Sequence, residues 1–183
     1  MLEIAETRDE TTIPRLMSVL DEEDVTYRRA AVVALGMIGL DAVPPLVESL
    51  TGSDNVVVRG SCAKALAQIA VNYPDDPFPT EGIEGLKRAI DDPNPVVHIA
   101  AVMALGEVGA SAVDVLIETL STTDNVAVAV AAVNAIASAG DERAISVLTA
   151  LTQDESVDSY VRESAVSALP RLDQVLNYKR SHI

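Results

Sequence analysis

The chain has 183 residues, of which 49% are apolar and only 3% aromatic. Thirteen basic and 28 acidic residues give a formal net charge of −15. This charge disfavours binding to nucleic acids and to anionic membrane surfaces, since both are strongly negative. The lone cysteine excludes an internal disulfide and favours a reducing compartment. We also find no secretory signal and no uncharged apolar run long enough for a membrane span. We therefore expect a cytoplasmic protein without membrane insertion.

Two patterns recur along the chain at the same irregular interval. The first is isoleucine or valine followed three residues later by leucine, and its copies are 30, 40, 30 and 32 residues apart. The second is an alanine-rich segment that ends in an aliphatic residue: Leu35, Leu66, Leu105, Ile136 and Leu169. The shared interval predicts a single domain of repeats, with boundaries at about 1–20 (partial), 21–50, 51–90, 91–120, 121–151 and 152–183 (a cap).

Each copy is predicted to contain a first helix, a tight turn and a second helix. An Asp or Asn precedes the first helix as its N-cap, and alanine fills the columns one and four residues before the aliphatic residue, where small side chains let helices approach closely. Cys62 is the one residue of these two columns that is not alanine, so we expect it to be a small buried side chain. Glycines that suit a helix C-terminus come after the aliphatic residue in three copies, at Gly36, Gly39, Gly106, Gly109 and Gly140.

Three segments depart from this pattern. Residues 71–80, VNYPDDPFPT, add about nine residues to the second copy, and their prolines predict an extended loop that carries Tyr73 and Phe78. The two rings either fill a gap between repeats or bind a partner. Residues 125–140 carry no charge, so this helix either tolerates exposure or mediates self-association. In the last copy Pro170 stands where a glycine is expected, and a short capping helix is predicted after it.

Stacking of such helical pairs predicts an all-α protein, a right-handed α-solenoid of about five helical hairpins with no strand. We expect the first helices on the convex side and the second helices on the concave side. The buried positions of each second helix are predicted to include the isoleucine or valine and the leucine of the first pattern.

The repeats resemble HEAT repeats, and specifically the short HEAT-like repeats of phycobilisome bilin lyases. The stretches DEEDVTYRRAAVVALGMIGLDAVPPLVESL and DDPNPVVHIAAVMALGEVGASAVDVLIETL carry this resemblance, which extends over about residues 10–172. The family includes bilin lyases, adaptors of phycobilisome degradation and scaffolds without chemistry of their own. The resemblance therefore implies the fold, while no catalytic motif can be transferred to numbered residues of this chain.

The arginine column of that family falls on Arg28, Arg59, His98, Ala129 and Arg162. Together with the caps Asp24 and Asp158, these side chains are expected to link successive repeats, and the alternative is that the arginines bind the carboxylates of a bilin. We expect His98 to be structural. Two histidines and one cysteine do not make a zinc site, so no metal is predicted.

The favoured hypothesis is a scaffold or adaptor that binds another protein. No catalytic residues are predicted, and the sequence leaves enzymatic activity open while favouring none. Its predicted contact residues are exposed positions of the second helices together with the two rings of the 71–80 loop: Glu48, Tyr73, Phe78, Glu84, Arg88, Asp114 and Glu118. Because four of these are acidic, the expected partner has a basic surface. The alternative is a bilin lyase, lyase subunit or chaperone that positions a tetrapyrrole on a phycobiliprotein, in which case a bilin is the ligand.

Overall fold

The computed structural model describes residues 9–181 and shows an all-α solenoid fold, with no strand among these residues. Positions 1–8, the start of the partial first repeat, and positions 182–183 lie outside the described residues. The chain divides into two compact units, Met1–Ala104 and Leu105–Ile183, whose boundary falls inside a helix. Each unit is described separately.

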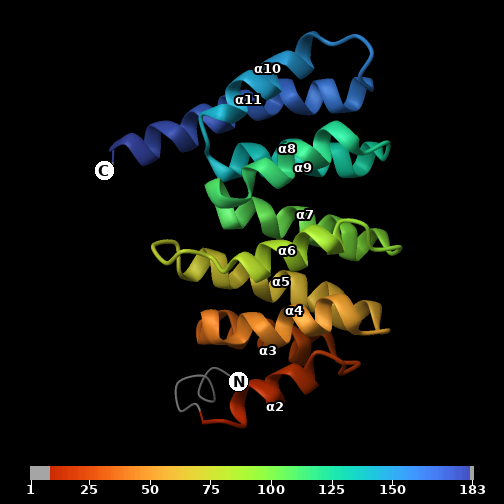
Figure 1. The fold of residues 1–183 in the computed structure, drawn as a ribbon, viewed down its shortest axis with the longest axis vertical. Coiled ribbons are helices and arrows are strands. Elements are labelled where there is room, and N and C mark those ends of the chain that lie inside the picture. The colour runs from red at the N-terminus through yellow and green to blue at the C-terminus, as the bar shows by residue number, and fades with distance from the viewer. Residues whose placement is uncertain (1–8, 182–183) are drawn as a thin grey trace. The chain divides into compact units, whose positions relative to one another are not determined.

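The first unit contains α2 (Thr12–Val19), α3 (Val25–Ile38), a 3-10 turn (Leu40–Ala42), α4 (Val43–Gly52), α5 (Val56–Asn72), α6 (Thr80–Ala89) and the first part of α7 (Pro95–Val108). The first helices α3 and α5 pack side by side, and so do the second helices α4 and α6 (Figure 1). The unit is thus built from two layers of helices.

The second unit begins in α7 and contains a 3-10 turn (Gly109–Ala112), α8 (Val113–Thr122), α9 (Val126–Ala139), α10 (Arg143–Gln153) and α11 (Ser159–Ser181). Here α9 packs against α8 and α11, and α10 packs against α11. The helix α11 runs without a break through Pro170, so the prediction of a separate capping helix after this proline is wrong. A proline inside a helix removes one backbone hydrogen bond, and in α11 this loss does not end the helix.

The first helices begin at the predicted caps. In each of the five, the side-chain oxygen of the cap accepts a hydrogen bond from a backbone N–H of the helix's first turn, as at Asp24, where the N···O distance to Thr26 is 2.7 Å. The hydrogen bonds from Thr26 hold the pKa of the Asp24 carboxyl below its usual value. The same helices bury their small-residue columns completely or nearly so: Ala31, Ala34, Cys62, Ala65, Ala101, Ala104, Ala132, Ala135, Ala165 and Ala168.

The second helices are buried in a slightly different register from the one predicted. The pattern leucines are buried, but Ile145 is 44% exposed and Ile13 and Ile83 are half-buried. Val43 and Val113 are fully buried as predicted, so the difference concerns the three isoleucines. The residue just before the isoleucine or valine is buried in every copy, and in α10 this residue is Ala144. A small side chain four residues before the leucine shares its helix face and allows the close packing.

One helical stretch of the described chain, 95–122, is long and apolar enough to cross a membrane, and its most apolar 18 residues have a mean hydropathy of 1.8. Half of its most apolar part is buried inside the fold. Core helices of soluble proteins have the same properties, so length and composition alone give weak support for a span.

Candidate functional site

Two arginines of the column, Arg28 and Arg59, bind the turns that precede their helices. In α3, Arg28 donates from Nη1 to the carbonyl oxygens of Glu22 and Glu23. In α5, Arg59 donates to the carbonyl oxygens of Ser53 and Asp54. Backbone carbonyls thus take up these two guanidinium groups, which supports a structural role for Arg28 and Arg59.

Arg59 also reaches the next repeat. Its Nε lies 2.6 Å from Oδ2 of Asp92 and its Nη2 lies 3.0 Å from Oδ1, a two-pronged contact. The side chains are only 12% and 7% exposed. The guanidinium of Arg59 lowers the pKa of the Asp92 carboxyl, with a further contribution from the N–H of Asn94. His98 is half-buried on α7, and it makes a smaller contribution that lowers the pKa of the Asp92 carboxyl.

Tyr73 and Phe78 turn toward their own unit. The Tyr73 hydroxyl donates to the Met37 carbonyl at 2.5 Å, and its ring occupies the space beside Gly39. The Phe78 ring occupies the space beside Gly82, close to Val43. Both side chains are half-buried. The structure therefore supports the alternative in which the rings fill gaps, and it offers neither ring as a freely projecting anchor.

The predicted acidic positions are exposed on the second helices of each unit. In the first unit these are Glu48 on α4 and Glu84 on α6, with Arg88 one turn further along α6. In the second unit they are Asp114 and Glu118 on α8, where Asp114 accepts a hydrogen bond from Arg143 at 2.6 Å. Sequence reasoning missed Arg143, which also binds Asp141 and lowers the pKa of its carboxyl.

The uncharged segment 125–140 is not the open strip that the self-association hypothesis assumed. Eight residues of α9 are buried, and Ala129 is only 7% exposed. Among the residues of α9, Asn134 accepts a hydrogen bond from Arg171 of α11. The lack of charge is therefore explained by burial, and an arginine at position 129 would not project freely into water.

The described residues contain no cluster of His, Cys, Asp and Glu that could hold a metal ion. Cys62 is fully buried, and burial raises the pKa of its thiol to about 12. A thiol that stays protonated at neutral pH is a poor nucleophile, which agrees with a role in packing.

A feature that sequence reasoning missed is the apolar surface of the first helices in the first unit. Every large apolar side chain exposed among the described residues of this unit belongs to α3, α5 or α7, and none to α2, α4 or α6. They are Val25, Tyr27, Val33, Met37, Val57, Val71, Val96 and Met103.

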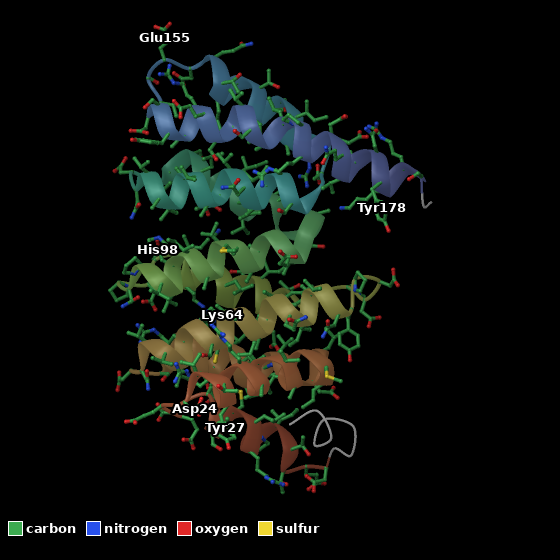
Figure 2. The ribbon with its side chains drawn as sticks, turned by 180° about the vertical axis from the view of Figure 1, so that it is seen from behind. Asp24, Tyr27, Lys64, His98, Glu155 and Tyr178 are labelled. Carbon is green, nitrogen blue, oxygen red and sulfur yellow. The ribbon has the colours of Figure 1, made fainter. Side chains whose placement is uncertain are left out.

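Part of this surface is hollowed into a groove of about 560 Å³, which we call the valine groove. It runs between α3 and α5 to the start of α7, and its lining is Val25, Arg28, Arg29, Val32, Val33, Val56, Val57, Gly60, Ser61, Lys64, Asn94 and Val96. No carboxylate lines it, although the chain as a whole carries a charge of −15. Lys64 projects from α5 (Figure 2).

Comparison with known proteins identifies the repeats. The family model of HEAT repeats matches residues 1–67 and 83–170. The chain belongs to the HEAT repeat family. Phycocyanin operon protein Z of Pseudanabaena tenuis is 58% identical over 178 residues, which are 97% of this chain and 88% of the relative. The bilin biosynthesis protein CpeZ of Synechococcus sp. is 32% identical over 92% of this chain and 93% of its own length.

Two solved structures share the fold. One is the complex of CpcE and CpcF of phycocyanin lyase from Nostoc sp., with a TM-score of 0.55 at 22% identity over 93% of this chain and 68% of that one. The other is an engineered protein, with a TM-score of 0.50 at 24% identity over 95% of this chain and 89% of that one. The likeness to these structures shows the fold alone, and the family model together with the two relatives places the chain among HEAT repeat proteins.

Proposed function

We propose that this HEAT repeat protein assists the attachment of a bilin to a phycobiliprotein, as a lyase subunit or as a chaperone that positions the pigment. The observation that carries the proposal is its 32% identity with a bilin biosynthesis protein over nine-tenths of both chains. A protein of this kind contributes by holding two reactants in the right geometry, which lowers the entropic part of the barrier. Its place of action under this proposal is the cytoplasm.

The test is bilin attachment in a heterologous bacterial host that makes phycocyanobilin. A phycobiliprotein subunit is expressed alone, with the chain, with a bilin lyase, and with both. The two backgrounds are the host without and the host with the bilin lyase. In at least one of them, we expect the chain to increase the covalently bound bilin several-fold. Pigment fluorescence of the subunit in denaturing gels measures this amount. Equal pigment with and without the chain in both backgrounds would overturn the proposal.

A protein-binding role is the second candidate, and the exposed acidic side chains Glu48 and Glu84 of the first unit favour it. The proposed partner is a protein with a basic surface, either the phycobiliprotein or a second lyase subunit. Exposed charges at an interface act mainly on the rate of encounter.

We predict that reversing Glu48 and Glu84 together to lysine slows association with such a partner about tenfold at low salt and flattens its salt dependence. Surface plasmon resonance with the apo-phycobiliprotein and with a lyase subunit measures this rate. The matched control reverses Glu10 and Glu22, which are exposed outside α4 and α6. If both pairs of reversals change the association rate equally, only net charge matters and the acidic contact surface is wrong.

A further inference from the structure

Two of the three cations that line the valine groove have no bonding partner among the described residues. In the part of the chain that the structure describes, Arg29 and Lys64 take part in no ion pair and no side-chain hydrogen bond, whereas the third cation, Arg28, is bound to backbone carbonyls. Arg29 comes from α3 and Lys64 from α5, so the groove has one free positive charge from each of its two helices. Both can bind a carboxylate through charge-assisted hydrogen bonds.

Valines make up half of the groove's lining. Val25, Val33, Val57 and Val96 are between 42% and 59% exposed, which is unusual for branched aliphatic side chains gathered at one place. A group of exposed apolar side chains beside a hollow marks a binding surface more often than a free one. The occupant must therefore have an apolar body.

Gly60 is a further feature of the groove that packing does not require. It lies inside α5, where glycine costs about 0.5–1 kcal/mol relative to alanine. Its φ angle is ordinary, and a Cβ placed there would meet only Val96 Cγ1 at 4.0 Å, so neither backbone conformation nor close packing requires glycine. The equivalent position carries a side chain in the other copies, namely Arg29, Ile99, Val130 and Glu163. Because glycine has no side chain, the groove is deeper at this position than it would be with any other residue.

We propose that the valine groove is a binding site for an open-chain tetrapyrrole dicarboxylate, a bilin, with its ring system on the valines and its two propionates on Arg29 and Lys64. This inference rests on the proposed function, from which the identity of the ligand class comes. A bilin combines an apolar conjugated body with two carboxylates, the chemistry that the groove complements. The groove volume lies within the usual range for small-molecule sites, about 300–1,000 Å³. Because it is a groove and not a closed cavity, one edge of the pigment stays accessible to an acceptor protein.

The experiment is a titration of the purified chain with phycocyanobilin, followed by absorbance and fluorescence. Arg29→Gln and Lys64→Gln are each expected to weaken binding about tenfold, the usual size of a charge-assisted hydrogen bond. Gly60→Leu is expected to weaken it at least as much by filling the groove. Arg15→Gln is the matched control, because it removes one exposed cation of α2 outside the groove and should leave binding unchanged.

Phycocyanobilin dimethyl ester lacks the two carboxylates, so comparing it with the free acid separates the contribution of the two cations to binding from that of the valines. The wild-type chain should bind the ester more weakly than the free acid, and the Arg29→Gln/Lys64→Gln double variant should bind both pigments equally. Thermal unfolding followed by circular dichroism checks that each variant folds, and Gly60→Ala, for which the structure has room, provides a second variant if leucine disrupts α5.

The outcomes distinguish this inference from the proposed function. If the groove variants and the control bind the pigment equally, or if the wild-type chain binds none while it still increases bilin attachment in the host, the groove assignment is overturned and the proposed function stands. If the groove variants lose binding to the apo-phycobiliprotein but keep the pigment, the groove is a protein contact and the inference is wrong. If the chain fails the attachment assay, the proposed function itself is lost.

Discussion

Replacing Gly106 with valine is expected to lower the free energy of unfolding by about 3 kcal/mol. A Cβ at this position of α7 would lie 2.9 Å from the Cα of Ala135 and 3.2 Å from its carbonyl oxygen, so the obstacle is the backbone of α9. Backbone cannot rotate away as the end of a long side chain can, and the two helices would have to separate. For a chain of this size the loss corresponds to a fall in Tm of about 6–12 °C.

Gly60→Ala is the matched control for Gly106→Val. Both glycines lie inside first helices, but only Gly60 has space for a Cβ. Alanine at position 60 should raise the free energy of unfolding by about 0.5–1 kcal/mol, because it removes the conformational cost of glycine in a helix. Thermal and urea unfolding of both variants measure the contrast. A Gly106→Val protein as stable as the wild type would show that α7 and α9 do not approach as closely as described.

The helical architecture could be predicted because it is determined by local chemistry repeated five times. An Asp or Asn cap, small residues at two positions on one face and, in three of the copies, a glycine at the end of the helix act within one helical hairpin. For example, Asn55 accepts from Val57 two residues away, whatever the rest of the chain does. Gly39 likewise has a φ of 84°, which side-chain-bearing residues rarely adopt, and so ends its helix without help from a distant segment.

The errors arose where exposure depends on how neighbouring helices pack. Residues 125–140 are uncharged, and this composition alone does not distinguish an exposed helix from a buried one. The helix is buried because α8 and α11 pack against it, and the segment's own sequence does not reveal these contacts. Ile145 fits the periodic pattern, yet α10 is rotated so that Ala144 takes the buried position. Tyr73 reaches Met37, which is 36 residues earlier in the chain and follows no local spacing.

The valine groove could have been noticed in part. Gly60 breaks a column that carries side chains in the other copies, and this break is visible in the sequence. The valines of α3 and α5 can also be seen in the sequence, but apolar residues at helical spacing normally belong to the core. Only the packing of α3 against α5 shows that Val33 and Val57 remain half outside it.

Asp92 is expected to contribute about 2–3 kcal/mol to stability at neutral pH, because its loss breaks a two-pronged bond and leaves the mostly buried charge of Arg59 with backbone carbonyls alone. Asp92→Asn should therefore lower the urea midpoint markedly at pH 7. The neighbouring Asp91→Asn is the control, since Asp91 is exposed and its backbone N–H bond to Arg88 does not involve the side chain.

The effect of Asp92→Asn should also depend on pH in one direction. Arg59 lowers the pKa of the Asp92 carboxyl in the folded state, so folding favours the charged form. The resulting stabilisation is fully present above the unfolded pKa of about 3.9 and is lost as the pH falls through the lower folded pKa. The stability difference between wild type and Asp92→Asn should thus be full at pH 7 and narrow below about pH 4. A difference that stays constant from pH 7 down to about pH 2 would mean that the carboxylate charge is not what joins the two repeats.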